Sequence, residues 1–258
     1  MPMSRVPASP AVPRLRSPLL SLCLVLALSA CSSEDRATGP EELRELAGSA
    51  QAEESRVTAE KYLRAVVHAY DRRTPLTLGL VTVEDVCAGG AAKEWLFSSG
   101  DEGHRVSCTM RATAYYGADP EKVGDVLDGV FTAGDRDLSA GVVTDAVPFG
   151  HDHYRRALVD YYRGRGPNPT GPDTPEPTQI SDPSQTLSWD TVRSSPKTLV
   201  VDPGPRTEGD PPVTRRLHEP ASTTVADIRE RYGMVFELKL SQTEYYRVSR
   251  KGAIVRTE

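Results

Sequence analysis

The spacing of hydrophobic residues along the chain predicts both strands and helices. From residue 104 to residue 115 apolar side chains alternate with polar ones, which is the pattern of a strand with one buried face. The apolar members of this strand are Val106, Cys108, Met110, Ala112 and Ala114. We therefore expect Cys108 to point toward the protein core.

Shorter patterns predict further strands in the first part of the chain. Residues 76–83 are rich in residues that favour strands, and Cys87-Ala-Gly-Gly indicates a turn after them. Residues 93–98 are expected to pair with the strand at 104–115, and residues 141–147 form another short strand.

Helical spacing of apolar residues predicts three helices before residue 164. The first covers residues 41–73, and the second begins at Asp119-Pro120 and ends at Gly134. The third covers residues 152–163, with Asp152 as a possible N-cap.

The C-terminal part of the chain repeats the mixture of elements. One or two short strands are expected within residues 187–201. Residues 224–232 predict a helix that Gly233 ends. Strands are expected at residues 234–240, 243–249 and 253–256.

Proline divides the chain, since 12 of its 21 prolines lie between residues 167 and 220. Residues 164–186 are expected to be a linker or a long surface loop, and residues 202–220 a second proline-rich loop. We expect an α+β domain at 56–163 and a C-terminal α+β subdomain at 187–258 that packs on it, because the smaller piece is marginal alone.

The predicted fold class is therefore α+β. An N-terminal helix and other packed helices accompany a mostly antiparallel sheet. A helix followed by an antiparallel meander is also the pattern of the cystatin-like and NTF2-like folds, which we keep as a fold analogy.

The N-terminus has the organisation of an export signal. Three arginines and no acidic residue lie within residues 1–30, and the apolar run Pro18–Ala30 is too short to span a bilayer. The run ends in Leu28-Ser29-Ala30-Cys31, which resembles the lipobox of bacterial lipoproteins. The alternatives are an ordinary secretory signal and a buried N-terminal helix.

The lipoprotein resemblance implies what happens to Cys31. In that family the signal peptide is removed before the cysteine, whose thiol carries a diacylglyceryl group and whose amine is often acylated. The mature protein would then be held by fatty acyl chains such as palmitate at the extracytoplasmic face of the cell membrane.

Charge excludes nucleic acid as an expected partner. Removal of residues 1–30 takes away three arginines and no acidic residue, so the formal net charge changes from −5 to −8. Residues 31–55 hold seven of the acidic residues and predict an acidic tether that leads into the first helix.

Two cysteines remain when Cys23 leaves with the signal peptide and Cys31 carries lipid. An even pair in an exported protein predicts a disulfide between Cys87 and Cys108. This bond would close a loop of about 20 residues and contribute roughly 3 kcal/mol to stability.

One cluster suggests metal chemistry. The sequence His151-Asp152-His153 places two imidazoles on an extended segment, and His104 or His218 could supply a third ligand to a hydrolytic metal. The simpler interpretation is a polar helix start capped by Asp152. No complete catalytic motif is present in the sequence, and no cofactor is expected.

The sequence thus predicts a lipid-anchored lipoprotein of the cell envelope. We expect its ectodomain to be non-catalytic and to bind a protein or another ligand, with an envelope protein as a possible partner. The alternatives are a solute-binding lipoprotein of a transporter and a metal-dependent extracytoplasmic hydrolase that uses His151 and His153.

Overall fold

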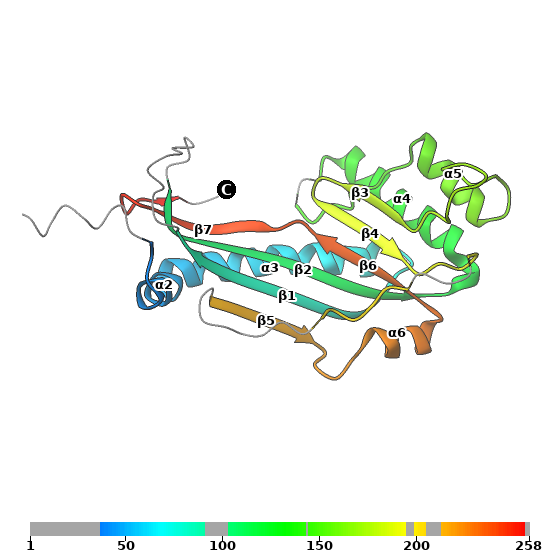
Figure 1. The fold of residues 1–258 in the computed structure, drawn as a ribbon. Coiled ribbons are helices and arrows are strands. Elements are labelled where there is room, and N and C mark those ends of the chain that lie inside the picture. Colours follow the sequence, from blue (N-terminus) through cyan, green and yellow to red (C-terminus); the bar gives the residue numbers. More distant parts are fainter. Residues whose placement is uncertain (1–36, 91–102, 143, 195–198, 205–212, 256–258) are drawn as a thin grey trace, which may run out of the picture. The chain divides into compact units, whose positions relative to one another are not determined.

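The structure is a computed structural model that describes residues 37–90, 103–142, 144–194, 199–204 and 213–255. Its contacts separate residues 1–36 from a compact unit formed by residues 37–258, to which every helix and strand below belongs. In chain order the elements are α2 (Pro40–Ala47), α3 (Ala50–Arg73), β1 (Thr77–Gly89), β2 (His104–Ala118), the 3-10 turn η1 (Pro120–Lys122), α4 (Val123–Ala140), α5 (His153–Tyr162), β3 (Gln179–Asp182), β4 (Gln185–Trp189), β5 (Val213–Glu219), α6 (Val225–Tyr232), β6 (Met234–Leu240), β7 (Thr243–Ser249) and β8 (Ile254–Val255). The unit is α+β, as the sequence predicts (Figure 1).

One antiparallel sheet contains all the strands that the structure describes. Its order is β3-β4-β6-β2-β1-β5, with β7 also paired to β2 and β8 paired to β7. The strands β6 and β7 follow each other along β2, one beside residues 113–118 and the other beside residues 104–110. Strands from both predicted parts of the chain therefore interleave in a single sheet.

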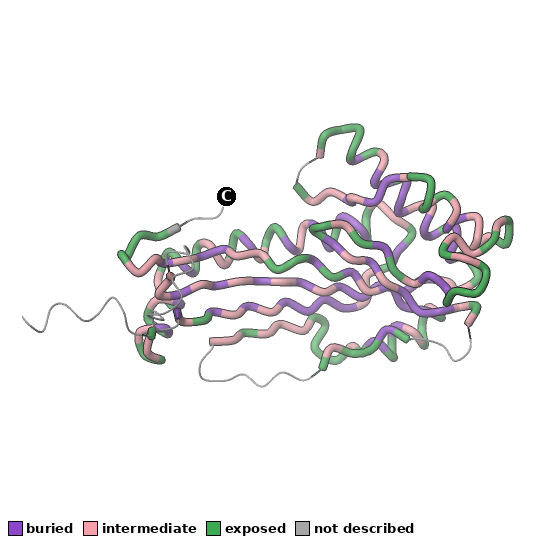
Figure 2. The backbone as a smooth tube through the Cα atoms, turned by 45° about the horizontal axis from the view of Figure 1, so that its top comes forward, coloured by how far each residue is buried: buried purple, intermediate pink, exposed green. Residues whose placement is uncertain are grey.

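The helix α3 covers one face of this sheet. Figure 1 shows it behind β1 and β2, and its side chains Leu63, Val66 and Val67 belong to the main hydrophobic core. The hydroxyl of Tyr116 on β2 donates a hydrogen bond of 2.8 Å to the backbone carbonyl of Val67. Buried residues of α4 and α5 join the same core (Figure 2).

The opposite face of the sheet meets α6 at one end. A smaller hydrophobic cluster there includes Leu80 of β1, Tyr115 of β2 and Ile228 of α6. Because neighbouring residues of a strand point to opposite faces, Tyr115 and Tyr116 are both buried but enter different cores.

Part of the acidic segment that follows the predicted anchor belongs to the folded unit. The helix α2 begins at Pro40 and buries Leu43 and Ala47, so three of the acidic residues of the predicted tether lie on this helix. The long helix predicted at 41–73 is divided after Gly48, where the Ser49 side chain accepts a hydrogen bond from the Ala52 amide and caps α3.

Several predicted boundaries are wrong. The residues Cys87–Gly89 belong to β1 and not to a turn, and α4 continues through Gly134 to Ala140. Gly134 does not end the helix; instead it lets the chain approach closely, since a Cβ atom there would lie 2.2 Å from the carbonyl oxygen of Phe149. The helix ends at Gly141, which adopts a left-handed conformation with φ of 65°.

Two further predictions fail, and one lies outside the described residues. Within residues 141–147 the described residues form a loop and not a strand, and residues 213–219 of the predicted second proline-rich loop form the edge strand β5. The strand expected at residues 93–98 lies outside the described residues. In residues 164–186 the loop is organised by Asn168, whose amide donates to two backbone carbonyls, before β3 begins.

Candidate functional site

The predicted disulfide between Cys87 and Cys108 is present in the structure. The two residues face each other on β1 and β2, their sulfur atoms lie 2.07 Å apart, and both side chains are buried. Alternation along β2 places Cys108 on the face covered by α3, as expected. The hydroxyl oxygen of Tyr245 lies 3.6 Å from the Cys87 sulfur.

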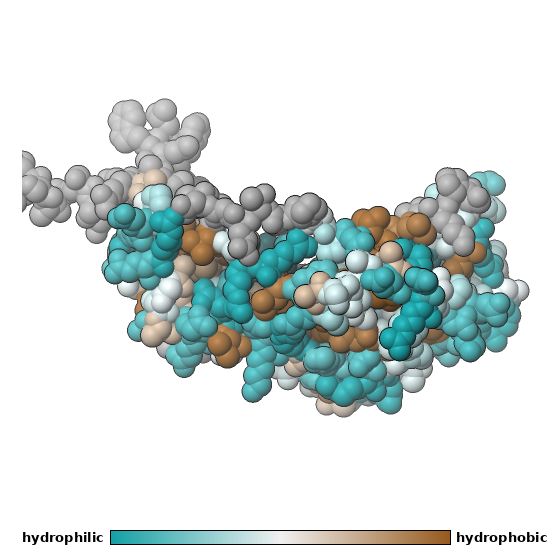
Figure 3. Space-filling view, turned by 90° about the horizontal axis from the view of Figure 1, so that it is seen from below, coloured by the Kyte–Doolittle hydropathy of each residue, from teal (hydrophilic) through white to brown (hydrophobic). Residues whose placement is uncertain are grey.

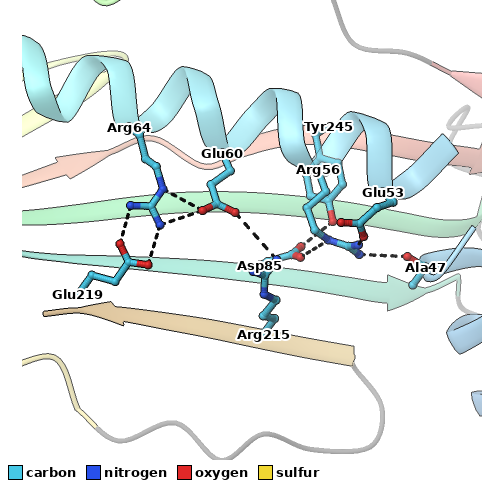
Figure 4. A network of polar contacts seen from close by, with 9 residues as sticks. All are labelled: Ala47, Glu53, Arg56, Glu60, Arg64, Asp85, Arg215, Glu219 and Tyr245. Atoms are coloured by element: carbon cyan, nitrogen blue, oxygen red, sulfur yellow. Dashed lines mark hydrogen bonds and ion pairs between the residues drawn. The ribbon is translucent and has the colours of Figure 1, made fainter. Parts of the chain in front are cut away.

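A buried polar cluster lies next to the disulfide, between α3 and the sheet (Figure 4). The Arg56 Nε donates a hydrogen bond of 2.6 Å to Asp85, and the Tyr245 hydroxyl donates another of 2.6 Å to the second oxygen of the same carboxylate. The guanidinium also pairs with Glu53 and donates to the carbonyl of Ala47 over 3.0 Å. We call Arg56, Asp85 and Tyr245 the buried triad.

The surroundings of the buried triad shift the pKa values of Arg56 and Tyr245. Burial alone would lower the pKa of Arg56, but the neighbouring Tyr245 and Asp85 raise it above its ordinary value, so the guanidinium stays charged. Burial, together with the neighbouring Asp85 carboxylate, raises the pKa of Tyr245 well above its ordinary value. Arg56 is therefore a cation, and Tyr245 is a neutral hydroxyl that donates its hydrogen bond to Asp85.

A second ion pair ties the edge strand β5 to α3 (Figure 4). The Arg64 guanidinium donates two hydrogen bonds to Glu219, of 2.8 and 3.1 Å, and a third of 2.8 Å to Glu60 on its own helix. Arg215 of β5 lies 3.9 Å from Glu60. The bond from Arg64 lowers the pKa of Glu219. These contacts hold α3 against β5, and their role is structural.

The structure brings His151 to two carboxylates of α4 and not to other histidines. Its Nδ1 lies 2.7 Å from an Asp135 oxygen and its Nε2 lies 3.0 Å from an Asp128 oxygen. Only a doubly protonated ring donates to both carboxylates. The ring edge also packs on Phe131. Partial burial opposes ionisation of Asp135, but its hydrogen bonds from His151 outweigh this effect and lower its pKa.

The predicted metal ligands do not converge. His153 is exposed in the first turn of α5, and His104 begins β2. His218 lies on β5, where its Nε2 is 2.8 Å from the carbonyl oxygen of Thr223. Asp152 is the N-cap of α5, since it accepts a hydrogen bond of 2.7 Å from the Arg155 amide. Across the described residues, no group of three or more metal-binding side chains is assembled.

The sheet face opposite α3 carries polar side chains beyond the end covered by α6. Glu84 pairs with Arg111 across β1 and β2, Lys239 lies 2.8 Å from Glu237, and Thr82 stands opposite Thr113. We call these six residues the polar face. Figure 3 views the molecule from the side of β5 and α6, where hydrophilic residues surround separate hydrophobic ones.

Two exposed aliphatic residues lie beside the polar face, near the end of the sheet that α6 covers. Val200 packs into the small core with Tyr115, while its neighbours Leu199 and Val201 are 46% and 71% exposed. Within the polar face Thr82 is buried and the side chains of Glu84 and Glu237 are only 12% exposed, whereas Arg111 and Lys239 are 42% and 58% exposed. A partner at this face would therefore meet Arg111, Lys239 and the aliphatic pair.

Comparison with known proteins does not assign the chain to a family. No family model, curated protein or solved structure matches the chain. The cystatin-like or NTF2-like analogy therefore stays a prediction.

Cys31 lies outside the described residues, so the lipid site stays a prediction as well. Within the part of the chain that is described, every helix is too short or too polar to cross a bilayer.

The buried triad was not predicted from the sequence, although the strand pattern holds a signal for it. Val81, Val83 and Cys87 mark the inward positions of β1, and alternation places Asp85 among them. A charged residue at a buried position needs a partner. The identity of that partner, Arg56, depends on how α3 lies across the sheet and could not be obtained from the strand alone.

Proposed function

We propose that the protein is a lipid-anchored lipoprotein of the bacterial cell envelope, whose ectodomain binds another envelope protein without catalysing a reaction. The proposal rests mainly on the sequence Leu28-Ser29-Ala30-Cys31, which ends a short apolar run that follows a basic segment. In this proposal Cys31 is acylated and becomes the first residue of the mature chain.

The disulfide supports an extracytoplasmic location. Cytosolic thiols are kept reduced, whereas exported proteins keep stable disulfides. The Cys87–Cys108 bond joins neighbouring central strands and is buried beneath α3, so it is part of the folded core. A protein that folds around such a bond is suited to an oxidising compartment.

The polar face supports a protein partner. It carries two pairs of opposite charges, Glu84 with Arg111 and Glu237 with Lys239, and it lies beside the exposed side chains of Leu199 and Val201. Protein interfaces combine an apolar centre with a polar rim, and here Leu199 and Val201 would supply the apolar part. A nucleic acid would instead be met by a basic surface.

Metabolic labelling tests the anchor. Cells that express the full chain and receive radiolabelled palmitate should yield a labelled protein that stays with membranes after a high-salt wash. The Cys31→Ala variant should keep its signal peptide and carry no label. Equal labelling of both proteins, or a wild-type chain without label, would refute the anchor.

Site-specific photocrosslinking tests the binding surface in intact cells. A photoreactive amino acid at Lys239, on the polar face, should give one discrete adduct, and a second substitution, Thr113→Arg, should abolish that adduct. The matched control is Lys61 on the outer face of α3, which is also exposed. The binding proposal fails if Lys239 and Lys61 give the same adducts, or if Thr113→Arg has no effect.

A further inference from the structure

The proposed lipid on Cys31 limits how far the folded unit can stand from the membrane. Five residues lie between Cys31 and Ala37, where the described fold begins, so six Cα–Cα steps join the two. A fully extended chain spans at most about 3.6 Å per residue, so this segment reaches roughly 20 Å. The end of the fold that holds Ala37 must therefore lie close to the bilayer surface. This step rests on the function proposed above.

Hydrogen bonds identify the elements at that end. The Thr38 amide donates to the carbonyl of Gly90 over 3.1 Å, and its hydroxyl donates to the carbonyl of Arg105 over 2.6 Å. The Arg250 amide donates to the carbonyl of Gly103 over 3.1 Å. The end of β1, the start of β2 and the turn between β7 and β8 thus lie together beside the first described residues (Figure 1).

The two sides of this end differ in charge. On one side α2, which contacts β1, β2 and β5, carries three glutamates and one arginine, and Glu42 among them pairs with Arg105. On the other side β8 pairs with β7, where Arg247 pairs with Glu244, and the turn between these strands adds the basic Arg250 and Lys251 and no acidic residue. Lys251 is exposed in the turn between these strands, and the aliphatic side chain of Ile254 is 43% exposed beside it.

We propose that the β7–β8 turn, with Arg250, Lys251 and Ile254, contacts the anionic phospholipid headgroups of the membrane that holds the anchor. Basic residues are attracted to an anionic leaflet within about one Debye length, roughly 10 Å, and a neighbouring aliphatic side chain fits the interface. The acidic helix α2 is repelled by the same headgroups and is turned away. The anchored unit therefore has one preferred orientation on the membrane.

Fluorescence quenching from the bilayer tests this orientation with the full lipidated protein. A fluorophore is attached to Lys251→Cys in one sample and to Glu45→Cys, on the exposed surface of α2, in the matched control. The native Cys87 and Cys108 are joined in a disulfide, and they leave the introduced thiol as the reactive one. The proteins are reconstituted into phosphatidylcholine vesicles with or without phosphatidylglycerol and with a headgroup-attached quencher.

The expected result is stronger quenching at position 251 than at position 45, with a loss of this difference when phosphatidylglycerol is omitted or when salt is raised. The double variant Arg250→Glu/Lys251→Glu, monitored by a label at Ile254→Cys and checked for an unchanged circular dichroism spectrum, should show reduced quenching. Equal quenching at positions 251 and 45 in vesicles that retain the protein would overturn the orientation alone. Failure of the protein to stay with the vesicles without detergent would overturn the anchor instead.

Discussion

Removal of the Asp85 carboxylate should be one of the most damaging single changes in the core. The Asp85→Ala variant leaves the guanidinium of Arg56 and the hydroxyl of Tyr245 without their shared acceptor between α3 and the sheet. The side chains of Arg56 and Asp85 are only 11% and 7% exposed, so water replaces the lost contacts poorly. Breaking a buried pair by removing one partner costs about 3–5 kcal/mol, and we expect a loss of about 3 kcal/mol in the free energy of unfolding.

The same reasoning predicts recovery when all the polar groups are removed together. A triple variant with Arg56→Met, Asp85→Leu and Tyr245→Phe buries no unpaired charge and keeps similar side-chain volumes. Buried ion pairs are often replaced by apolar groups at little cost, so its stability should lie within about 1 kcal/mol of the wild type. The triad would then be a device for positioning α3 and not a large source of stability.

Urea unfolding followed by circular dichroism, with the disulfide intact, measures these differences. The matched control is Glu219→Ala, a carboxylate that is 53% exposed and that pairs with Arg64 of the same helix α3. This change should cost less than about 1 kcal/mol. If Asp85→Ala costs no more than Glu219→Ala, burial of the triad is not the source of its sensitivity and the argument is wrong.

Three further predictions follow from the described contacts. The Cys87→Ser/Cys108→Ser variant should lose about 3 kcal/mol of unfolding free energy in urea, because the native bond closes a loop of about 20 residues. The lowered pKa of Asp135 stabilises the fold above pH ~4 and this contribution is lost as the pH falls through the lowered value, so the difference in Tm between wild type and His151→Gln should shrink from pH 6 to pH 3. A Gly90→Ala change would place a Cβ atom 1.6 Å from the backbone carbonyl oxygen at the start of β2, and it should cost about 2 kcal/mol in the same urea assay.

Each of these predictions has a contradicting result. Addition of a reducing agent should destabilise the wild type and leave the serine variant unchanged; an equal effect on both proteins would assign the loss to another cause. A constant or growing Tm difference toward low pH would exclude the Asp135 explanation. For the glycine, the control is Gly204→Ala, where a Cβ atom meets nothing within 4 Å. Equal costs at Gly90 and Gly204 would show that crowding is not responsible.

The elements that the sequence predicted well are those whose signal is local. Alternation identified β2 and β6, because each buries one face against helices or core residues of the sheet. The capping residues Asp152 and Thr224 mark the starts of α5 and α6 through hydrogen bonds to the first turn of their own helix. The partners in such contacts are only a few residues apart in the chain, so they can be predicted from the sequence.

The elements that were missed depend on distant parts of the chain. The edge strand β5 lies in a proline-rich region and contains Arg215, Arg216 and Glu219, and its pairing with β1 spans more than 100 residues. The partners of His151 are likewise set by the packing of its loop on α4, which no local pattern specifies. The disulfide was predictable because only one pair of cysteines remained in the proposed mature chain.

The interleaved order of strands affects how the polypeptide acquires its structure. The central strand β2 receives one neighbour from β1 at once, but its other neighbours, β6 and β7, come from residues 234–249. Contacts between such distant segments form slowly, and a half-synthesised chain has only part of the sheet available to it. For the exported protein that we propose, this delay keeps the polypeptide unfolded, and so competent for translocation, until its C-terminal strands have been synthesised.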